Sequence, residues 1–318
     1  MMLFLGVDGG QSGTTALVAG RSGRVLGVGQ AGPCNHVGGP DGRAKFTAAI
    51  QGSVEAACRQ AGAEPRFAAA CLGFSGGPAD KDELVRELIQ TGQFLITDDA
   101  AIALTGATGG APGIVTIAGT GSISYGRNAA RKQARAGGWG HVFGDEGGAF
   151  DLTRQAMRAA LRIEEGWGQQ TTLHRMLLAQ TGASTANELL HRLYSADFPK
   201  PRIAALARLV DEAAMNGDPV ARELLNAAAG QLATLTIAVR GQLFAPGEKV
   251  RVAWMGGVFR SNLLRERFRM FVELEDGVAA GPPLHGPAAG ALMEAFRLAG
   301  MAVELSGVPA MEKNSAVR

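Results

Sequence analysis

The sequence is poor in cysteine, in charged residues and in aromatic residues, and it has no long apolar run. Its three cysteines, Cys34, Cys58 and Cys71, have neither the close pairing of a zinc site nor the even number of a disulfide framework. No stretch approaches the roughly 18 apolar residues of a membrane span. The N-terminal apolar run is interrupted at Asp8, too early for an export signal. These absences predict a protein of the reducing cytoplasm that does not bind membranes.

Charge and phosphate motifs exclude two further classes. The 31 basic and 29 acidic residues give a net charge of +2 with no basic run, so we expect no nucleic-acid partner. The P-loop pattern GxxxxGK[ST] is absent. The segment 27–32 does match GxGxxG, but Pro33 follows it and no helix is expected there, which argues against a dinucleotide-binding fold.

Glycine, in contrast, is abundant, with 46 residues in a chain of 318. Two glycine turns, at 8–14 and 119–122, each follow an apolar strand and precede a second strand. Backbone N–H groups can approach phosphate closely where side chains are absent, and glycine also allows positive φ. Both turns are therefore candidate phosphate loops, although each could be an ordinary hairpin turn. Their repetition indicates an internal duplication. A mostly helical stretch follows, and then a strand at 250–255 ends at a Gly-Gly pair.

Together with the motifs at 99–101, 137–141, 144–148 and 256–258, these turns resemble the N-acetylglucosamine kinase branch of the BadF/BadG/BcrA/BcrD ATPase family. That family belongs to the actin, Hsp70 and hexokinase superfamily. The resemblance covers most of the chain in the right order. It implies an α/β fold of two ribonuclease-H-like (actin-like ATPase) domains with a central cleft. We expect an N-terminal domain at 1–109, onto which a helix near 287–302 packs back, a larger domain at 110–286 with a helical insertion, and a homodimer.

The resemblance also implies ATP and Mg²⁺ as cofactors and assigns residues to them. Asp8 resembles the carboxylate that holds Mg²⁺, usually through water. The other expected nucleotide contacts are Gly9, Gly10, Ser12, Thr14, Gly119, Thr120, Gly121, Gly217, Gly256 and Gly257. The expected sugar contacts are Asn35, His36, Ser75, Gly138, Trp139, Gly140 and Asp145.

Asp99 is the expected catalytic residue. Phosphoryl transfer uses a carboxylate that accepts the proton of the attacking hydroxyl, and Asp99 lies between a strand and a helix, where the family has its Asp-Ala pair. An aspartate in that setting is also a common helix N-cap, so Asp98 could cap while Asp99 acts, or the reverse. Asp145 could likewise cap the helix that begins near residue 148. Trp139 could be a core residue, as we expect of Trp167 and Trp254.

The predicted reaction is transfer of the γ-phosphoryl group of ATP to the 6-hydroxyl of an amino sugar, N-acetylglucosamine or glucosamine. A few side chains separate loops that recognise an acetamido group from loops that recognise an amine, so the sequence does not choose between them. The alternative is an ATPase of the BadF/BcrA type that activates a partner dehydratase or reductase. Those relatives need cysteines for an iron–sulfur cluster, and this chain has none after Cys71.

Overall fold

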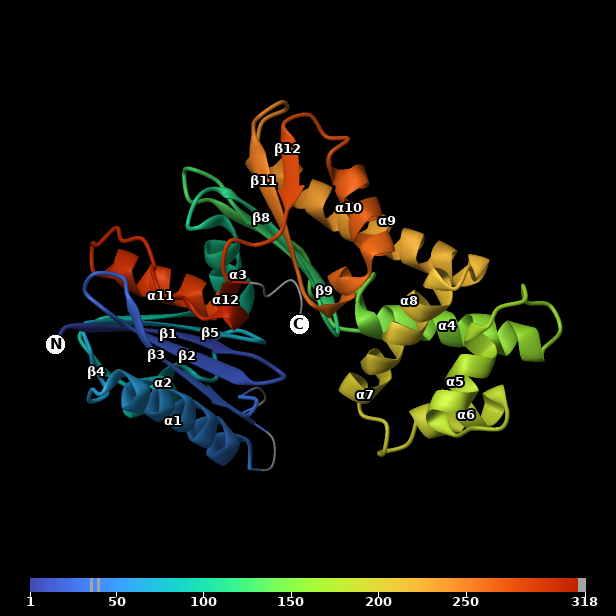
Figure 1. The fold of residues 1–318 in the computed structure, drawn as a ribbon, viewed down its shortest axis with the longest axis horizontal. Coiled ribbons are helices and arrows are strands. Elements are labelled where there is room, and N and C mark those ends of the chain that lie inside the picture. The colour runs from blue at the N-terminus through green and yellow to red at the C-terminus, as the bar shows by residue number, and fades with distance from the viewer. Residues whose placement is uncertain (35–36, 39–40, 314–318) are drawn as a thin grey trace. The chain divides into compact units, whose positions relative to one another are not determined.

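A computed structural model describes residues 1–34, 37–38 and 41–313 (Figure 1). The structure is α/β and divides into two compact units, each built around a five-stranded sheet. Unit 1 comprises Met1–Val115 together with the described residues from Pro282 onward, and unit 2 comprises Thr116–Gly281. The chain thus leaves unit 1, forms unit 2 and returns to unit 1.

The sheet of unit 1 has the order β3-β2-β1-β5-β7. The first three strands are antiparallel neighbours, while β5 and β7 continue the sheet in parallel with β1. Parallel neighbours end at the same edge of a sheet, so side chains that follow them are brought together. The strands are β1 (Leu3–Gly9), β2 (Thr14–Gly20), β3 (Val25–Ala31), β5 (Ala69–Phe74) and β7 (Phe94–Asp98); β4 (Arg66–Phe67) and β6 (Gln90–Thr91) form a separate pair.

Helices cover both faces of this sheet (Figure 1). Side chains alternate along β1, so that Leu3, Leu5 and Val7 join one apolar core with α1, while Phe4 joins the other with α11. Phe4 stacks on Phe296 of α11 with ring centroids 4.1 Å apart. The helices of unit 1 are α1 (Gly42–Ala61), α2 (Asp82–Leu88), α3 (Asp99–Thr108), α11 (Pro287–Leu298) and α12 (Ala310–Lys313).

The sheet of unit 2 repeats the strand order of unit 1, third-second-first-fourth-fifth, as β10-β9-β8-β11-β12. Its strands are β8 (Gly113–Ala118), β9 (Ser122–Arg127), β10 (Gln133–Gly137), β11 (Val250–Met255) and β12 (Val278–Gly281). The helices inserted between β10 and β11 are α4 (Ala149–Glu164), α5 (Leu173–Thr181), α6 (Ala186–Leu193), α7 (Lys200–Ala204), α8 (Arg208–Met215) and α9 (Pro219–Leu243). The helix α10 (Asn262–Val272) precedes β12.

The α/β fold class is confirmed, and the repeated strand order agrees with an internal duplication. Two details differ from expectation. The edge strand β12 was not predicted, because it is only four residues long and none of them is buried. Trp167 was expected in a core but is 64% exposed, whereas Trp254 is buried. None of the helices in the described residues is long and apolar enough to span a bilayer.

Candidate active site

Three parallel strands of unit 1 bring polar side chains to one edge of the sheet. Asp8 lies near the end of β1, Ser75 follows β5, and Asp98 ends β7. The strand register pairs Gly9 with Phe74 and Phe74 with Asp98. Ser75 also donates its backbone N–H to the carbonyl of Gly9, at 3.1 Å. Residues far apart in the sequence thus lie side by side at the carboxyl edge, where open α/β sheets bind ligands.

The two adjacent aspartates at this edge have different partners. Asp98 is the N-cap of α3, because its Oδ1 accepts the N–H of Ala101 at 2.7 Å. Asp99 does not cap the helix. Its Oδ2 accepts the hydroxyl of Ser75 at 2.8 Å. Burial raises the pKa of Asp99, with a smaller contribution from the charge of Asp98, and the Ser75 hydrogen bond opposes the rise. The capping function thus belongs to Asp98. The carboxylate of Asp99 accepts the Ser75 hydroxyl, and the backbone N–H groups of Ala100 and of Asp99 itself also oppose the rise in its pKa.

Asp8 is the most strongly perturbed carboxyl group of this edge. Burial raises its pKa to about 8, and the charges of Glu312 and Asp99 add to the rise. A bound cation would stabilise the ionised form of such a buried carboxyl group. The described residues contain no cluster of three or more metal-ligating side chains. A single carboxylate nevertheless fits Mg²⁺, which uses one or two carboxylates together with water and substrate phosphates.

The first glycine turn, between β1 and β2, is closed by a hydrogen bond from the N–H of Gly10 to the carbonyl of Gly13 at 3.0 Å. Ser12 is exposed at its tip, while Thr14 is buried and donates to the carbonyl of Gly32 at 2.8 Å. Gly9 is needed for space, since a side chain there would collide with the Phe74 ring. Neither these glycines nor those of the second turn have positive φ. The positive φ that glycine allows is therefore not used in these turns, and close packing explains the glycine at Gly9 and at Gly121.

The second glycine turn, between β8 and β9, docks on the start of α4. The carbonyls of Gly119 and Thr120 accept the N–H groups of Ala149 and Phe150, at 2.9 and 3.1 Å. A Cβ on Gly119 would meet nothing within 4 Å, whereas one on Gly121 would collide with the carboxyl group of Asp145. This turn therefore has one open side and one side packed against a residue expected to contact sugar.

The segment from Gly137 to Gly148, which we call the wrapping loop, has several residues with positive φ. Gly138 and Gly140 have φ of 73° and 79°. Asp145 also has a left-handed backbone, with φ of 64°. A residue other than glycine keeps this conformation when contacts with its neighbours stabilise it. Its Oδ1 accepts the N–H of Ser122 at 3.3 Å, so it binds the second glycine turn and does not cap α4. Trp139 is 66% exposed, which excludes a core position.

Two lysines that the sequence did not single out support these loops. Lys81 is buried and donates to the carbonyl of Gly77 at 3.0 Å, which fixes the Ser-Gly-Gly turn after β5. Lys200, from the helical insertion, places its ammonium 3.4 Å from Oδ2 of Asp145. Neither lysine has a local motif, and only the folded chain shows which loop each one meets. The sequence alone therefore could not distinguish Lys81 or Lys200 from an ordinary surface lysine.

The expected adenosine residues belong to unit 2, at the ends of β11 and α8. Gly256 has φ of 101°, and a side chain there would collide with the carbonyl of Ala118. Gly257 follows it and opens a short 3-10 helix, and Gly217 precedes α9 with φ of 91°. Between α8, α9 and α10 lies a groove of about 980 Å³, whose lining includes Met215 and Asn262. Asn35 and His36 lie outside the described residues.

Comparison with known proteins agrees with this architecture. The sequence model of the BadF/BadG/BcrA/BcrD ATPase family matches residues 5–295. An N-acetylmuramic acid/N-acetylglucosamine kinase from Clostridium acetobutylicum is 36% identical over 65% of this chain and 69% of its own. An N-acetyl-D-glucosamine kinase from Dictyostelium discoideum is 31% identical over 83% of this chain and 88% of its own.

Solved structures show the same relationship. The crystal structure of a candidate N-acetylglucosamine kinase from Chromobacterium violaceum has a TM-score of 0.76 at 28% identity, covering 92% of this chain and 98% of that one. A ROK family glucokinase from Streptomyces griseus has a TM-score of 0.54 at 19% identity, with 94% and 99% covered, and supports the fold alone.

Two sheets of one strand order, each with a glycine turn after its first strand, define the class of actin-like ATPases and sugar kinases. Within that class, the chain belongs to the BadF/BadG/BcrA/BcrD ATPase family. Its curated relatives make its enzyme class that of an ATP-dependent carbohydrate kinase, with a small sugar as substrate.

Proposed function

We propose that this enzyme transfers the γ-phosphoryl group of ATP to the 6-hydroxyl of an amino sugar, N-acetylglucosamine or glucosamine. The proposal rests above all on the different hydrogen-bond partners of Asp98 and Asp99. Asp98 caps α3, and Asp99 is left with a raised pKa and one hydroxyl partner. A kinase needs a carboxylate that is positioned, ionised at working pH and able to accept a proton.

Asp99 acts on the sugar. Its carboxylate accepts the proton of the attacking hydroxyl as the bond to phosphorus forms. The hydrogen bond from Ser75 fixes the orientation of the carboxylate and opposes the rise in its pKa that burial causes. Lys81 holds the turn that carries Ser75, so it is a positioning residue. Each of these groups belongs to the carboxyl edge of the unit 1 sheet.

The nucleotide is bound by backbone and hydroxyl groups. Ser12 and Thr120 lie in the two glycine turns, and the open side of Gly119 leaves room for phosphate oxygens. Asp8 would hold Mg²⁺, directly or through water, and that ion would neutralise the phosphate charge. The groove between α8, α9 and α10 has the size and mixed lining of an adenosine site.

The sugar is bound by the wrapping loop. Trp139 offers an exposed ring for the apolar face of a pyranose. Asp145, whose carboxyl group is buried against Gly121 in the free protein, would accept hydrogen bonds from the sugar hydroxyl groups. The ammonium of Lys200, 3.4 Å from Oδ2 of Asp145, holds this side chain in place. Gly138 and Gly140 give the loop its left-handed turns.

The activator-ATPase function has little support. An iron–sulfur cluster needs several accessible thiolates, and Cys34, Cys58 and Cys71 are all buried. Burial raises the pKa of Cys34 to about 11 and raises the pKa of Cys71 as well, so neither thiol ionises readily.

A coupled ADP-release assay over a panel of sugars tests the proposal. The panel is glucose, glucosamine, N-acetylglucosamine, N-acetylmannosamine and N-acetylmuramic acid. We expect ADP release that depends on sugar and is fastest with N-acetylglucosamine or glucosamine. Release that is equally fast with no sugar would overturn the proposal and favour the activator ATPase.

The two ends of the second glycine turn form a matched pair of substitutions. We expect Gly121→Ala to displace Asp145 and weaken sugar binding by about tenfold or more, which is about 1.4 kcal/mol. Gly119→Ala meets open space in the free protein, so it should leave sugar binding intact and weaken ATP binding, because the methyl group occupies the phosphate position. Isothermal titration calorimetry with each ligand separately measures both effects. Equal losses in both variants would mean that the turn is only structural.

A further inference from the structure

A second groove of about 430 Å³ lies between α4 and α9, within unit 2. Its wall on α4 carries Arg154, Arg158 and Arg162, which are spaced four residues apart and so lie along one side of the helix. On α9 its lining includes Leu224 and Gln231. The groove thus combines a row of guanidinium groups with apolar and amide surface, and no step of the proposed reaction uses it.

The arginines of this row are incompletely paired. Arg154 binds Asp151 at 2.6 Å, but its buried Nε has no hydrogen-bond partner. Arg158 donates to the amide oxygen of Gln155, at 3.3 Å, and the guanidinium carbon of Arg162 lies 4.9 Å from the ring centre of Trp167. Among the described residues, neither Arg158 nor Arg162 forms a salt bridge. Arg158 and Arg162 are exposed. The buried Nε of Arg154 is an unsatisfied donor, and such a donor in a native protein calls for an explanation such as a water or an ion at that place.

Carboxylates also line the groove, and they narrow the class of ligand. Glu146 and Glu223 are part of its lining. They would repel a bare anion but would accept hydrogen bonds from hydroxyl groups. The combination fits a ligand with both a phosphate group, for the arginines, and hydroxyl groups, for the carboxylates. A phosphorylated sugar has this chemistry.

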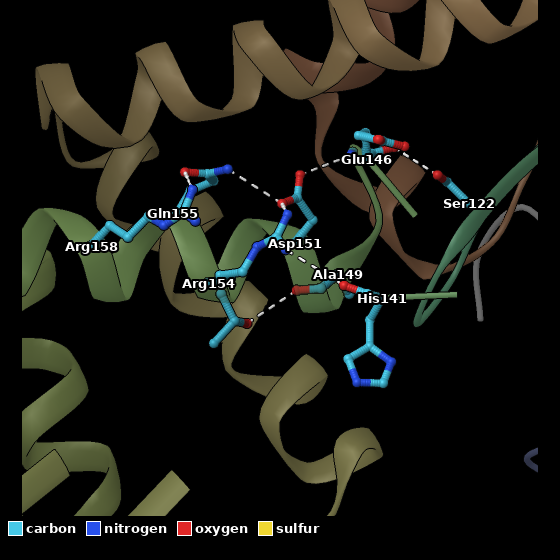
Figure 2. A network of polar contacts seen from close by, with 10 residues as sticks. Ser122, His141, Glu146, Ala149, Asp151, Arg154, Gln155 and Arg158 are labelled. Carbon is cyan, nitrogen blue, oxygen red and sulfur yellow. Dashed lines mark hydrogen bonds and ion pairs between the residues drawn. The ribbon is translucent and has the colours of Figure 1, made fainter. Parts of the chain in front are cut away.

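The groove is linked to the wrapping loop through Arg154 and Asp151 (Figure 2). Arg154 Nη1 donates to the carbonyl of His141 at 3.5 Å. Asp151 accepts the N–H of Gly147 at 3.1 Å while it accepts Arg154 through its other oxygen. The pair therefore holds two points of the loop. An anion that draws Arg154 away from Asp151 would weaken both contacts with the loop, at His141 and at Gly147.

We propose that the groove between α4 and α9 is an effector site for a sugar phosphate, and that its occupancy lowers sugar affinity through Arg154 and the wrapping loop. The phosphate binds Arg158 and Arg162 and completes the hydrogen bonding of Arg154. The hydroxyl groups face Glu146 and Glu223. The effect on sugar affinity rests on the proposed function of the loop, whereas the binding of the sugar phosphate does not.

The test is calorimetric titration of the full chain with N-acetylglucosamine 6-phosphate in the presence of saturating N-acetylglucosamine, which occupies the proposed sugar site. We expect binding to remain, weakened by the same factor by which the sugar phosphate lowers sugar affinity. It should weaken by a further tenfold or more, on the order of one lost charge-assisted hydrogen bond, in the double variant Arg158→Gln, Arg162→Gln. Arg175→Gln, which removes an exposed arginine of α5, is the matched control and should bind as the wild type does. Quenching of Trp167 fluorescence, absent in Trp167→Phe, reports occupancy independently.

Three outcomes would overturn the proposal. The double variant could bind as tightly as the wild type, saturating sugar could abolish binding, or inorganic phosphate could bind as tightly as the sugar phosphate. The first two exclude the groove, and the third excludes sugar recognition. None depends on turnover, so a failure of the proposed kinase activity would be seen separately, as absent ADP release in the unmodified enzyme.

Discussion

Replacing Asp99 by Asn is expected to lower turnover by about 10²–10⁴-fold while sugar and ATP still bind. The amide keeps the size of the side chain and can still accept the Ser75 hydroxyl, but it cannot take a proton from the sugar. Steady-state kinetics, together with calorimetric titration of each ligand, separates the loss of chemistry from a loss of binding.

The neighbouring aspartate is the control for this experiment. Asp98→Asn should retain both turnover and stability, because Asn caps a helix about as well as Asp. Asp98→Ala should lower the free energy of unfolding by about 0.5–2 kcal/mol, as the loss of a cap does, and leave turnover largely intact. If Asp98→Asn were inactive and Asp99→Asn active, the assignment of the two residues would be reversed.

Replacing Asp8 by Asn is expected to stabilise the free protein at alkaline pH and to abolish activity. In the folded chain the pKa of Asp8 is about 8, against an ordinary value of 3.8. The folded state therefore holds this proton more tightly than the unfolded state, so wild-type stability falls as pH rises from about 4 to 8. The Asn variant escapes that loss and should gain roughly 2–5 kcal/mol above pH 8.

Urea unfolding of both proteins between pH 4.5 and 9, without nucleotide or Mg²⁺, measures this gain. The difference in unfolding free energy should grow with pH and level off above pH 8. Adding ATP and Mg²⁺ should stabilise the wild type alone, because only it binds them in the expected way. A difference that does not change with pH would mean that Asp8 is already ionised in the free protein.

The sequence predicted the features that depend on local pattern. Apolar strands, glycine turns and the Asp98-Asp99 pair are contiguous in the chain, so their order and type could be predicted. The choice between the two aspartates could not, because it depends on which one faces Ser75, a residue 24 positions away. Two hydrogen bonds of the structure show that Asp98 caps α3 and that Asp99 faces Ser75, and the catalytic role of Asp99 stays a prediction.

Long-range packing explains what the sequence did not predict. Gly121 is a glycine because Asp145 lies against it, and not because of its own backbone angle. Lys81 and Lys200 come from separate segments, and each meets its loop only in the folded chain. Trp167 was misjudged because apolar aromatics usually lie in cores, whereas this ring is exposed and lies near Arg162. The predicted domain boundary, homodimer and contacts of Asn35 and His36 stay predictions.

The destination of the phosphoryl group decides whether this enzyme is the amino-sugar kinase proposed above. The protein is incubated with ATP, Mg²⁺ and N-acetylglucosamine, and the products are followed by ³¹P NMR with correlation to sugar protons. We predict a phosphate monoester signal coupled to the protons on carbon 6, growing in step with ADP and absent with Asp99→Asn. Inorganic phosphate as the only new phosphorus product, formed at the same rate with and without sugar, would contradict the proposed reaction.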